Sequence, residues 1–599
     1  MSNNPKAPRW DMESIFPGGS KSKEYAEFRH GIKNDLEAIS KMLDKLSGKT
    51  DKSCFADWGK FILAIQDVYR KLYHAGSFVE CLVSQDVNDT DANTIYSELD
   101  NYDALYGSLL TGFEEFATKL DDSDWDDFIA ENNLGEIRFY LDKMRERAKS
   151  KMPPEFERLA LELAVDGYHG WNRLYDKMAG ELRAPWKDNG ETKQISMGQL
   201  TPKFDNPDRE VRREAFEKYE EAWDSRAALA ALTLNSQAGF RLALYKRRKW
   251  DSVLKEPLMI AKISRETLDA MWSAVDKVVP QFQKYIDARK KLMGIDKYMW
   301  YDQTAPVGKL DKEFTFQEAS DFIIEHIGSF SSEMGEFSKM ALDNRWVEGE
   351  DRSGKSAGGY CTGFPMIKQS RIFMTYTNTF GNMSTLAHEL GHAYHSYVLK
   401  ELPIFGSRYP MTLAETASTF NELRVKDAAL SMAKNPMEKL MLMDQKLQDG
   451  YIMFCNLHAR FIFDKTFYEE RKNGMVNRNR LDEIMLEAQK KAYGGTLEGF
   501  YPLFWASKLH FFLTGQPFYN FPYTFGFLFS TGIYDRAVKE GASFAKAYRN
   551  LLADTGIMMA EDVAKKHLDV DLKKEDYWND AVARVTADID PFVKLAESI

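Results

Sequence analysis

The chain has 599 residues, of which 44% are hydrophobic and 13% are aromatic, so it has ample material for a packed interior and is not a disordered chain. A formal net charge of −11 argues against a general nucleic-acid-binding protein, because phosphate backbones require a basic surface. The four cysteines lie far apart and form no CxxC pair, which indicates free thiols in a reducing compartment. No stretch reads as a signal peptide or a membrane span, so we expect a cytoplasmic protein without a membrane partner.

The first break in a mainly helical pattern lies at residues 184–200, APWKDNGETKQISMGQL. Its Asn189-Gly190 pair is a hairpin signal. We therefore expect a hairpin here and a domain boundary near residue 200, with an N-terminal helical domain over residues 1–200 and a second domain over residues 201–599.

Helical periodicity dominates the residues that follow. The segment 208–248 is rich in Ala, Leu, Glu and Arg and is apolar at three- and four-residue intervals. Asn206-Pro207-Asp208 supplies a cap residue, a proline for the first helical position and an acid near the helix start. Ser264 and Thr315 are expected to begin two further helices. The sequence therefore predicts a mainly α fold.

A glycine-rich region at residues 349–380 interrupts the helices again. Residues 349–356, GEDRSGKS, match the phosphate-loop expression G-x-x-x-x-G-K-S, but no hydrophobic strand precedes them and more glycine follows, so we do not expect nucleotide binding. The glycines favour a mobile loop over a cleft. Residues 370–380 alternate as a strand does, and they predict either an edge that pairs with a peptide or a short hairpin beneath the next helix.

The next helix carries the sequence MSTLAHELGHAYHSY, from Met383 to Tyr397. His388 and His392 are four residues apart and lie on one face of a helix, where two imidazoles can converge on one tetrahedral metal ion. Glu389 is rotated by only about 100°, so it can reach a water molecule on the metal without being a ligand. The alternative is a core helix with buried histidines, since H-E-x-x-H arises by chance in about one chain per hundred of this composition.

A metal site needs a third ligand. His395 lies seven residues from His388, about 10.5 Å along a helix, whereas zinc lies about 2 Å from its ligands, so His395 is expected to pack or support. In PMTLAETASTFNELRV, a helix capped by Thr412 would place Glu415 and Glu422 on one face. Thr412 to Glu415 also fits a capping box, in which Glu415 only satisfies a backbone N–H, and the local sequence does not decide between the two.

HELGHAYH, followed 23 residues after His392 by ETASTFNE, resembles the thimet oligopeptidase and oligoendopeptidase F family of zinc peptidases. The oligoendopeptidase F branch is the nearer match. The similarity extends to WDMESIFPGGSKSKEY near the N-terminus, to ISRETLDAM and to FMTYTNTFGNM. It implies a large two-lobed helical fold, with a small β-sheet beside the active site and a deep substrate cleft, and it makes residues 201–599 the catalytic domain.

The resemblance also implies roles for individual residues. His388, His392 and Glu415 would bind one Zn2+ per chain, and Glu389 would be the general base. Glu422 would be a supporting carboxylate. The implied substrates are short, unstructured oligopeptides cleaved at internal bonds, and residues 370–380 would be the edge that binds them.

A late aromatic segment, HFFLTGQPFYNFPYTFGF, contains His510, Tyr519 and Tyr523. Considered alone, it could be an aromatic core segment. The resemblance implies that these three side chains contact the substrate and stabilise the developing oxyanion. Phe527 stands where the family pattern has a further tyrosine, so the separate roles of the three stay open.

Two other functions remain open at this point. One is a metallo-carboxypeptidase or dipeptidase on a similar scaffold, which would recognise a free peptide terminus. The other is a non-catalytic peptide-binding protein in which H-E-L-G-H is incidental. The sequence does not predict the oligomeric state.

Overall fold

The computed structural model describes residues 7–188, 190–308 and 313–599. This part of the chain is mainly helical, with one two-stranded and one three-stranded sheet, which confirms the expected fold class. Its contacts divide it into two compact units. Unit 1 comprises Met1–Pro154, Lys312–Val425 and Arg536–Asp569, and unit 2 comprises Glu155–Asp311, Lys426–Asp535 and Val570–Ile599. The expected boundary near residue 200 would give two domains that are each continuous in sequence, whereas each unit here takes three stretches of chain. That boundary stays a prediction.

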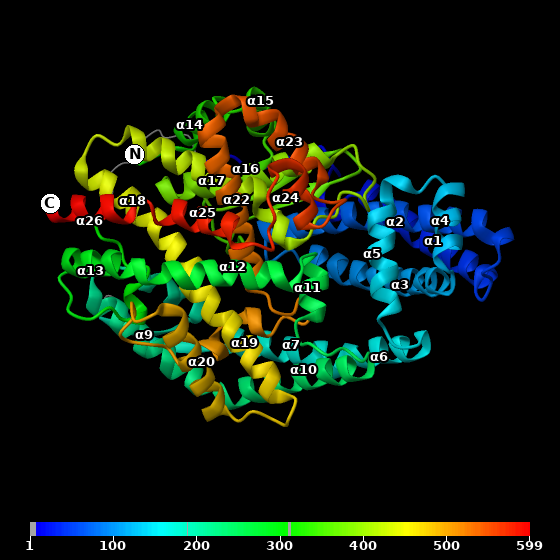
Figure 1. Ribbon diagram of the computed structural model, residues 1–599, viewed down its shortest axis with the longest axis horizontal. Helices are drawn as coiled ribbons and strands as arrows, with labels where there is room; N and C mark the ends of the chain where they lie inside the picture. Colours follow the sequence, from blue (N-terminus) through cyan, green and yellow to red (C-terminus); the bar gives the residue numbers. More distant parts are fainter. Residues whose placement is uncertain (1–6, 189, 309–312) are drawn as a thin grey trace. The chain divides into compact units, whose positions relative to one another are not determined.

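The first segment of unit 1 is a bundle of long helices, drawn in blue and cyan in Figure 1. In the first helix, Ile32, Leu36 and Ile39 recur at three- and four-residue intervals and are at most 3% exposed, so they form one buried face. Ser22 caps this helix by accepting the Tyr25 N–H. The helices of the bundle are α1 (Lys23–Leu46), α2 (Phe55–Gln85), α3 (Thr90–Lys119), α4 (Asp122–Glu131) and α5 (Arg138–Lys149).

A three-stranded sheet in the order β3-β5-β4 belongs to the second segment of unit 1. It consists of β3 (Val347–Glu348), β4 (Tyr360–Phe364) and β5 (Gln369–Phe373). β5 pairs parallel with β3 and antiparallel with β4, so it has a neighbour on each side. Of the two alternatives for residues 370–380, the strand edge is therefore wrong, because β5 ends at Phe373 and lies between β3 and β4. The short hairpin is confirmed, since β4 and β5 pair antiparallel and both contact α16.

The loop between β3 and β4 contains the phosphate-loop match at residues 349–356. The short strand β3 directly precedes it, contrary to expectation, but it leads into strand β4, whereas a phosphate loop opens a helix. Two backbone hydrogen bonds tie it to the end of α2, from Val87 N–H to Gly354 O and from Ser356 N–H to Ser84 O, both 2.9 Å.

The remaining helices of unit 1 come before and after the three-stranded sheet in the sequence. Thr315 starts one of them with a capping box, since its hydroxyl accepts the Glu318 N–H and the Glu318 carboxylate accepts the Thr315 N–H. These helices are α14 (Phe316–Gly328), α15 (Ser332–Asp343), α16 (Phe380–Leu399), the first part of α17 (Met411–Met432), the end of α22 (Phe521–Glu540), α23 (Ala545–Asp554) and α24 (Ala560–Leu568).

Unit 2 contains the hairpin that the sequence predicts. β1 (Arg183–Asp188) pairs antiparallel with β2 (Glu191–Ser196), and the last pair of the ladder is Asp188 with Glu191. The ladder therefore closes over a two-residue turn in which Gly190 has a φ of +86°. Asn189 lies outside the described residues.

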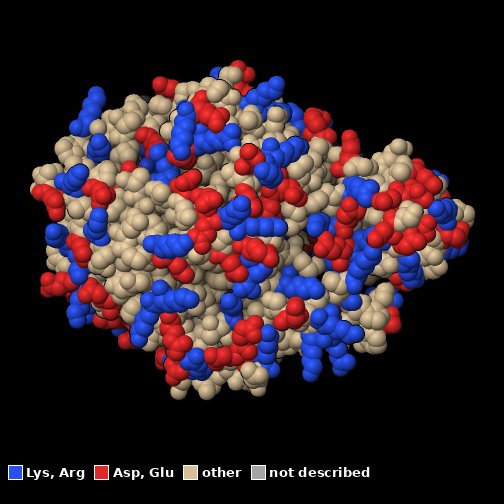
Figure 2. Space-filling view, in the orientation of Figure 1, with Lys and Arg blue, Asp and Glu red and all other residues tan. Residues whose placement is uncertain are grey.

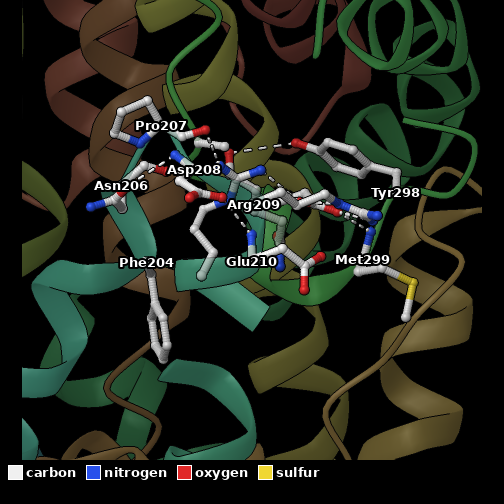
Figure 3. Close-up of polar contacts among 12 residues, drawn as sticks. Phe204, Asn206, Pro207, Asp208, Arg209, Glu210, Tyr298 and Met299 are labelled. Atoms are coloured by element: carbon white, nitrogen blue, oxygen red, sulfur yellow. Dashed lines mark hydrogen bonds and ion pairs between the residues drawn. The ribbon is translucent and has the colours of Figure 1, made fainter. Parts of the chain in front are cut away.

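The long helical segment expected over residues 208–248 is two helices, α9 (Arg209–Asp224) and α10 (Ala227–Arg247). Asp208 caps α9 by accepting the Glu210 N–H, so the helix begins two residues later than a cap at Asn206 would give. Figure 3 shows this start of α9, with Arg209 between Asn206 on one side and Tyr298 and Met299 on the other.

A buried carboxylate, Asp302, anchors the start of α9. It is fully buried and forms ion pairs with Arg209 (2.8 Å) and Arg212 (3.0 Å), and it accepts the Met299 N–H (3.0 Å). Arg209 also donates to the carbonyl of Lys297. One acid thus ties α9 to the turn at residues 297–302.

The other elements of unit 2 are helical. They are α6 (Pro154–Gly167), α7 (His169–Glu181), α8 (Met197–Leu200), α11 (Lys255–Ala261), α12 (Arg265–Val278), α13 (Phe282–Met293), α18 (Pro436–Tyr451), α19 (Leu457–Arg471), α20 (Arg478–Tyr493), α21 (Phe504–Ser507), the main part of α22, α25 (Glu575–Thr586) and α26 (Ile589–Ser598). Ser264 caps α12, as expected from the sequence. Short 3₁₀ turns and one π-helical turn, Ile452–Asn456, complete the secondary structure.

The surface carries charges of both signs. On the face shown in Figure 2, lysine and arginine side chains are interspersed with aspartate and glutamate side chains. Within the described ranges, no helix has the length and apolar character needed to cross a bilayer. The four cysteines are free, and three of them, Cys54, Cys81 and Cys455, are buried.

Candidate metal centre

The two motif histidines lie on α16, which Thr379 caps by accepting the Asn382 N–H. His388 and His392 are one helical turn apart, half-buried, and their ring centroids are 4.9 Å apart. Both imidazoles therefore face the same side of the helix, as their spacing predicts.

Glu415 lies on α17 and points at both imidazoles. Its Oε2 is 3.3 Å from His388 Nε2 and 3.5 Å from His392 Nε2. One ligand atom from each of the three residues lies within 4.8 Å of the others, and they are the one such His, Cys, Asp and Glu group among the described residues. α17 begins at Met411, so Thr412 does not stand at the cap position that a capping box with Glu415 would need. Ser418 donates to Glu415 Oε2 (2.7 Å) and orients the carboxylate.

A glycine inside the motif allows α16 and α17 to approach closely. A Cβ atom at Gly391 would lie 2.4 Å from the carbonyl oxygen of Ala417 and 2.5 Å from the Cα of Ser418. These are backbone atoms of α17, so a side chain at residue 391 would push the two helices apart. The glycine of H-E-L-G-H thus fixes the distance between the helix of the histidines and the helix of Glu415.

Glu422, seven residues after Glu415 on α17, contacts the second ring nitrogen of His388. Its Oε2 is 3.0 Å from His388 Nδ1, and Ser384 Oγ is 3.4 Å from its Oε1. A carboxylate at Nδ1 leaves Nε2 of His388 directed at Glu415 and His392. This is the arrangement that orients metal-binding histidines in proteins.

Glu389 lies beside the cluster and is 6% exposed. Burial and the nearby carboxylates of Glu415 and Glu422 raise its pKa to about 7, although His388 opposes the shift. Its Oε2 is buried and has no hydrogen-bond partner within the described part of the chain. A buried carboxylate with a free oxygen and a pKa near neutrality is suited to accept and release a proton.

The charges within the cluster are strongly coupled. Burial disfavours a charge on His388, but its hydrogen bonds to Glu415 and Glu422 outweigh this and raise its pKa. Burial and the charge of His388 lower the pKa of His392 to about 4. Burial opposes ionisation of Glu415, but its contacts with His388 and His392 lower its pKa to about 2. Glu415 is therefore ionised and His392 neutral, which are the protonation states that a metal ion requires, whereas His388 must release a proton to become a ligand.

His395, the third histidine of the helix, does not join the cluster. It is fully buried, its Nε2 lies 2.7 Å from Thr555 Oγ1, and its ring stacks on Tyr409 at 4.2 Å. It packs, as the helix geometry predicts.

The late aromatic residues form a cluster of their own in unit 2. His510 and Tyr519 have ring centroids 5.3 Å apart, and Tyr523 lies 5.3 Å from Tyr519 and 6.2 Å from His510. Burial and the charges of Arg460 and Lys508 lower the pKa of His510 to about 4, so its imidazole is neutral at neutral pH. The three side chains that the sequence grouped together thus lie together.

Comparison with known proteins decides the family. A sequence model of peptidase family M3 matches residues 204–584, which is more than half of the chain. This chain belongs to peptidase family M3. A second model, described as oligopeptidase F, matches residues 118–183 of the same M3 family member.

Individual relatives of this M3 family member share its full length. It is 24% identical over 571 residues to oligopeptidase PepF of Bacillus subtilis, covering 93% of this chain and 82% of the relative. It is 24% identical over 614 residues to the chromosomal oligoendopeptidase F of Lactococcus lactis subsp. cremoris, covering 99% and 98%. The crystal structure of oligoendopeptidase-F from Enterococcus faecium superposes with a TM-score of 0.72 at 19% identity, over 96% of this chain and 100% of that one, and so shares its fold. The resemblance noted in the sequence is confirmed.

Two residues near Glu389 in this M3 family member were not predicted. A Cβ atom at Gly359, just before β4, would lie 3.9 Å from Glu389 Oε1. Burial and the Glu389 carboxylate raise the pKa of the Cys361 thiol, which places Cys361 beside the same carboxylate. The strand-forming residues Tyr360–Phe364 were the available signal, but only the sheet order shows that they form the outer strand beside α16.

Proposed function

We propose that this protein is a zinc-dependent endopeptidase that hydrolyses internal bonds of short, unstructured oligopeptides. The observation that carries the proposal is the convergence of His388, His392 and Glu415 on one point, with the buried carboxylate of Glu389 beside it. Membership of peptidase family M3 and similarity to relatives named as oligopeptidases support the reaction class.

The donor set suits zinc. Two imidazole nitrogens and one carboxylate oxygen are the ligands that catalytic zinc sites use, with a further position left for water or substrate. One ion per chain would be held by His388, His392 and Glu415, with Glu422 and Ser418 orienting the ligands. When bound, zinc polarises the scissile carbonyl and acidifies water.

Glu389 would act as the proton carrier. As the carboxylate, it takes a proton from the attacking water, and it then passes this proton to the nitrogen of the departing amine. The pKa of about 7 lets it perform both steps near neutral pH. Its burial also keeps bulk water away from the proton.

The aromatic cluster of unit 2 would assist the same step. His510, Tyr519 and Tyr523 carry N–H and O–H donors that suit an oxyanion. We assign them to substrate contact and oxyanion stabilisation, with His510 acting as a neutral donor because its pKa is low.

The test is Glu389→Gln. We expect turnover of an end-blocked peptide to fall by about a thousandfold or more, because the proton carrier is lost, while the protein still binds one zinc ion measured by elemental analysis. Glu438→Gln, at a partly exposed position of α18 away from the histidine cluster, is the matched control and should keep full turnover. Normal turnover by Glu389→Gln would disprove the mechanism.

The same assay separates the two other functions. A carboxypeptidase or dipeptidase would cleave free peptides and spare end-blocked ones. A non-catalytic peptide-binding protein would show no chelator-sensitive hydrolysis of either. We expect cleavage of end-blocked peptides and its loss on chelation.

A further inference from the structure

A cavity of about 740 Å³ lies in unit 1 and has no role in the proposed chemistry. Its walls come from α2, from the facing ends of β4 and β5, from the second half of α16 and from residues 402–409. α16 also carries His388 and His392, so one helix serves both the metal centre and this cavity. Its volume is in the range of sites that enclose a ligand group.

Six aromatic side chains contribute to the cavity wall. The aromatic residues that line it are Tyr69, Tyr73, Trp346, Phe364, Tyr397 and Tyr409. Leu63, Ala393, Leu399, Leu402 and Ile404 add aliphatic surface. Such a wall favours an aromatic guest, because each ring offers edge and face contacts.

The basic side chains of the wall are already engaged. Arg70 is paired with Asp67, and Lys368 is paired with Glu401. Lys400 Nζ lies 3.7 Å above the centre of the Tyr397 ring, and the Arg408 guanidinium lies 4.7 Å above the Tyr69 ring. A charged guest would compete with these contacts, whereas an aromatic guest would not.

The strand β4 connects this cavity to the catalytic carboxylate. Gly359, before the start of β4, lies against Glu389, whereas Gly363 and Phe364 at its other end line the cavity. Four residues of strand span about 13 Å. An extended peptide that pairs with the outer edge of β4 would therefore enter the cavity about four residues from the bond at Glu389.

Tyr73 of α2 stands where this edge meets the cavity. A Cβ atom at Gly363 would lie 3.5 Å from the Tyr73 hydroxyl, so this hydroxyl lies against β4. Tyr73 also lines the cavity. A peptide that follows the edge of β4 as far as Gly363 would therefore meet the Tyr73 ring.

We propose that this cavity is a specificity subsite, which binds a bulky aromatic side chain of the substrate about four residues from the cleaved bond. The inference rests on the proposed peptidase function and adds a preference remote from the reacting atoms. Tyr73 is a specificity-determining residue in this proposal, and it takes no part in the chemistry.

The experiment uses the full-length zinc enzyme and end-blocked alanine-rich peptides with one fixed cleavage site. A single tryptophan is moved one residue at a time along both sides of that site, and kcat/KM is measured for each peptide. We expect a maximum at about the fourth residue on one side, about tenfold above the alanine peptide. In Tyr73→Ala this ratio should fall to about one, and Tyr73→Phe should restore it, because the ring supplies the contact.

Tyr96→Ala is the matched control, since Tyr96 lies on α3 outside the cavity and is 44% exposed, against 41% for Tyr73. It should keep the full ratio. If peptides are cleaved but kcat/KM does not depend on the tryptophan position, or Tyr73→Ala keeps the maximum, the subsite is disproved and the peptidase function stands. If no peptide is cleaved in a chelator-sensitive way, the peptidase function fails and the subsite fails with it.

Discussion

At the scale of single residues, the contact between Glu422 and His388 determines which imidazole nitrogen faces Glu415 and His392. Because Glu422 Oε2 lies 3.0 Å from Nδ1, Nε2 is left for the zinc ion that we propose. Glu415 contacts both imidazoles directly. In the proposed site the two acids of α17 therefore have different roles, Glu415 as a ligand and Glu422 as a support, although they share a helix face.

Substitution distinguishes these two parts. We expect Glu415→Ala to abolish tight zinc binding, because it removes one of three ligands. Glu422→Ala should weaken zinc affinity by about 10- to 100-fold, because it only frees the His388 ring. Competition titration with a chromogenic chelator measures both. Equal affinities for the two variants would contradict the assignment.

The carboxyl group of Glu220 on α9 predicts how the stability of the fold depends on pH. Burial and the charges of Glu217 and Asp224 raise its pKa from 4.5 to about 7. The folded state therefore holds a proton that the unfolded state releases, so stability falls as pH rises from about 4.5 to about 7. Glu220→Gln should stabilise the protein at pH 8 by about 1 kcal/mol, allowing for solvent screening, and should have no effect below pH 4.5. Thermal unfolding measures this, with Glu214→Gln at an exposed position of α9 as the control.

Residue spacing predicted part of the metal centre. His388, Glu389 and His392 follow from the helical repeat alone. Glu415 could not be predicted from the repeat, because a capping box fitted the same residues equally well. Its assignment as a ligand rested on the family resemblance. The start of α17 at Met411 could not be foreseen locally, since it depends on the packing of that helix against α16.

At the scale of elements, the junction between α9 and the turn at residues 297–302 depends on Asp302. Asp302→Ala should destabilise the protein by about 3–5 kcal/mol, because it leaves the buried guanidinium of Arg212 without its counter-charge. The exposed Arg213 pairs with Glu210 and Glu217 on the same helix, and Arg213→Ala should cost less than about 1 kcal/mol. Urea denaturation of both variants measures the difference. Equal losses of unfolding free energy would show that the buried ion pair stabilises the protein no more than the exposed pairs do.

Local signals predicted element boundaries well where a cap or turn residue decides them. Ser264 and Thr315 begin helices, and the hairpin closes at Gly190. The strand edge was placed in the wrong strand, because alternation shows that residues 370–373 form a strand but not which neighbours pair with it. Strand order depends on contacts between segments that single-sequence patterns do not contain.

At the scale of the whole molecule, zinc should act as a stabilising ligand. His388, His392 and Glu415 come from two helices, so the ion binds the folded state and not the unfolded chain. With free zinc about a hundredfold above Kd, binding adds about 2.7 kcal/mol, so chelation should lower Tm by several degrees. Differential scanning calorimetry measures this. The Tm of Glu415→Ala should not respond to chelator, and an equal response would place the stabilising ion elsewhere.

The sequence predicted a boundary near residue 200 from the hairpin, but compact units need not follow chain order. Unit 1 and unit 2 each take three stretches of chain. Nothing in local composition marks where the backbone passes from one unit to the other, since α17 and α22 cross these points within continuous helices.

The alternation of the chain between the two units affects how the protein folds during synthesis. The unit that holds the candidate metal centre takes its last segment from Arg536–Asp569, so it lacks one of its three segments until those residues have left the ribosome. The core of the bundle α1–α5 also stays incomplete until Phe364, Phe373 and Phe405 have been made. A newly made chain stalled before residue 536 should therefore attract chaperones, and activity should arise only once residues 536–569 have been made.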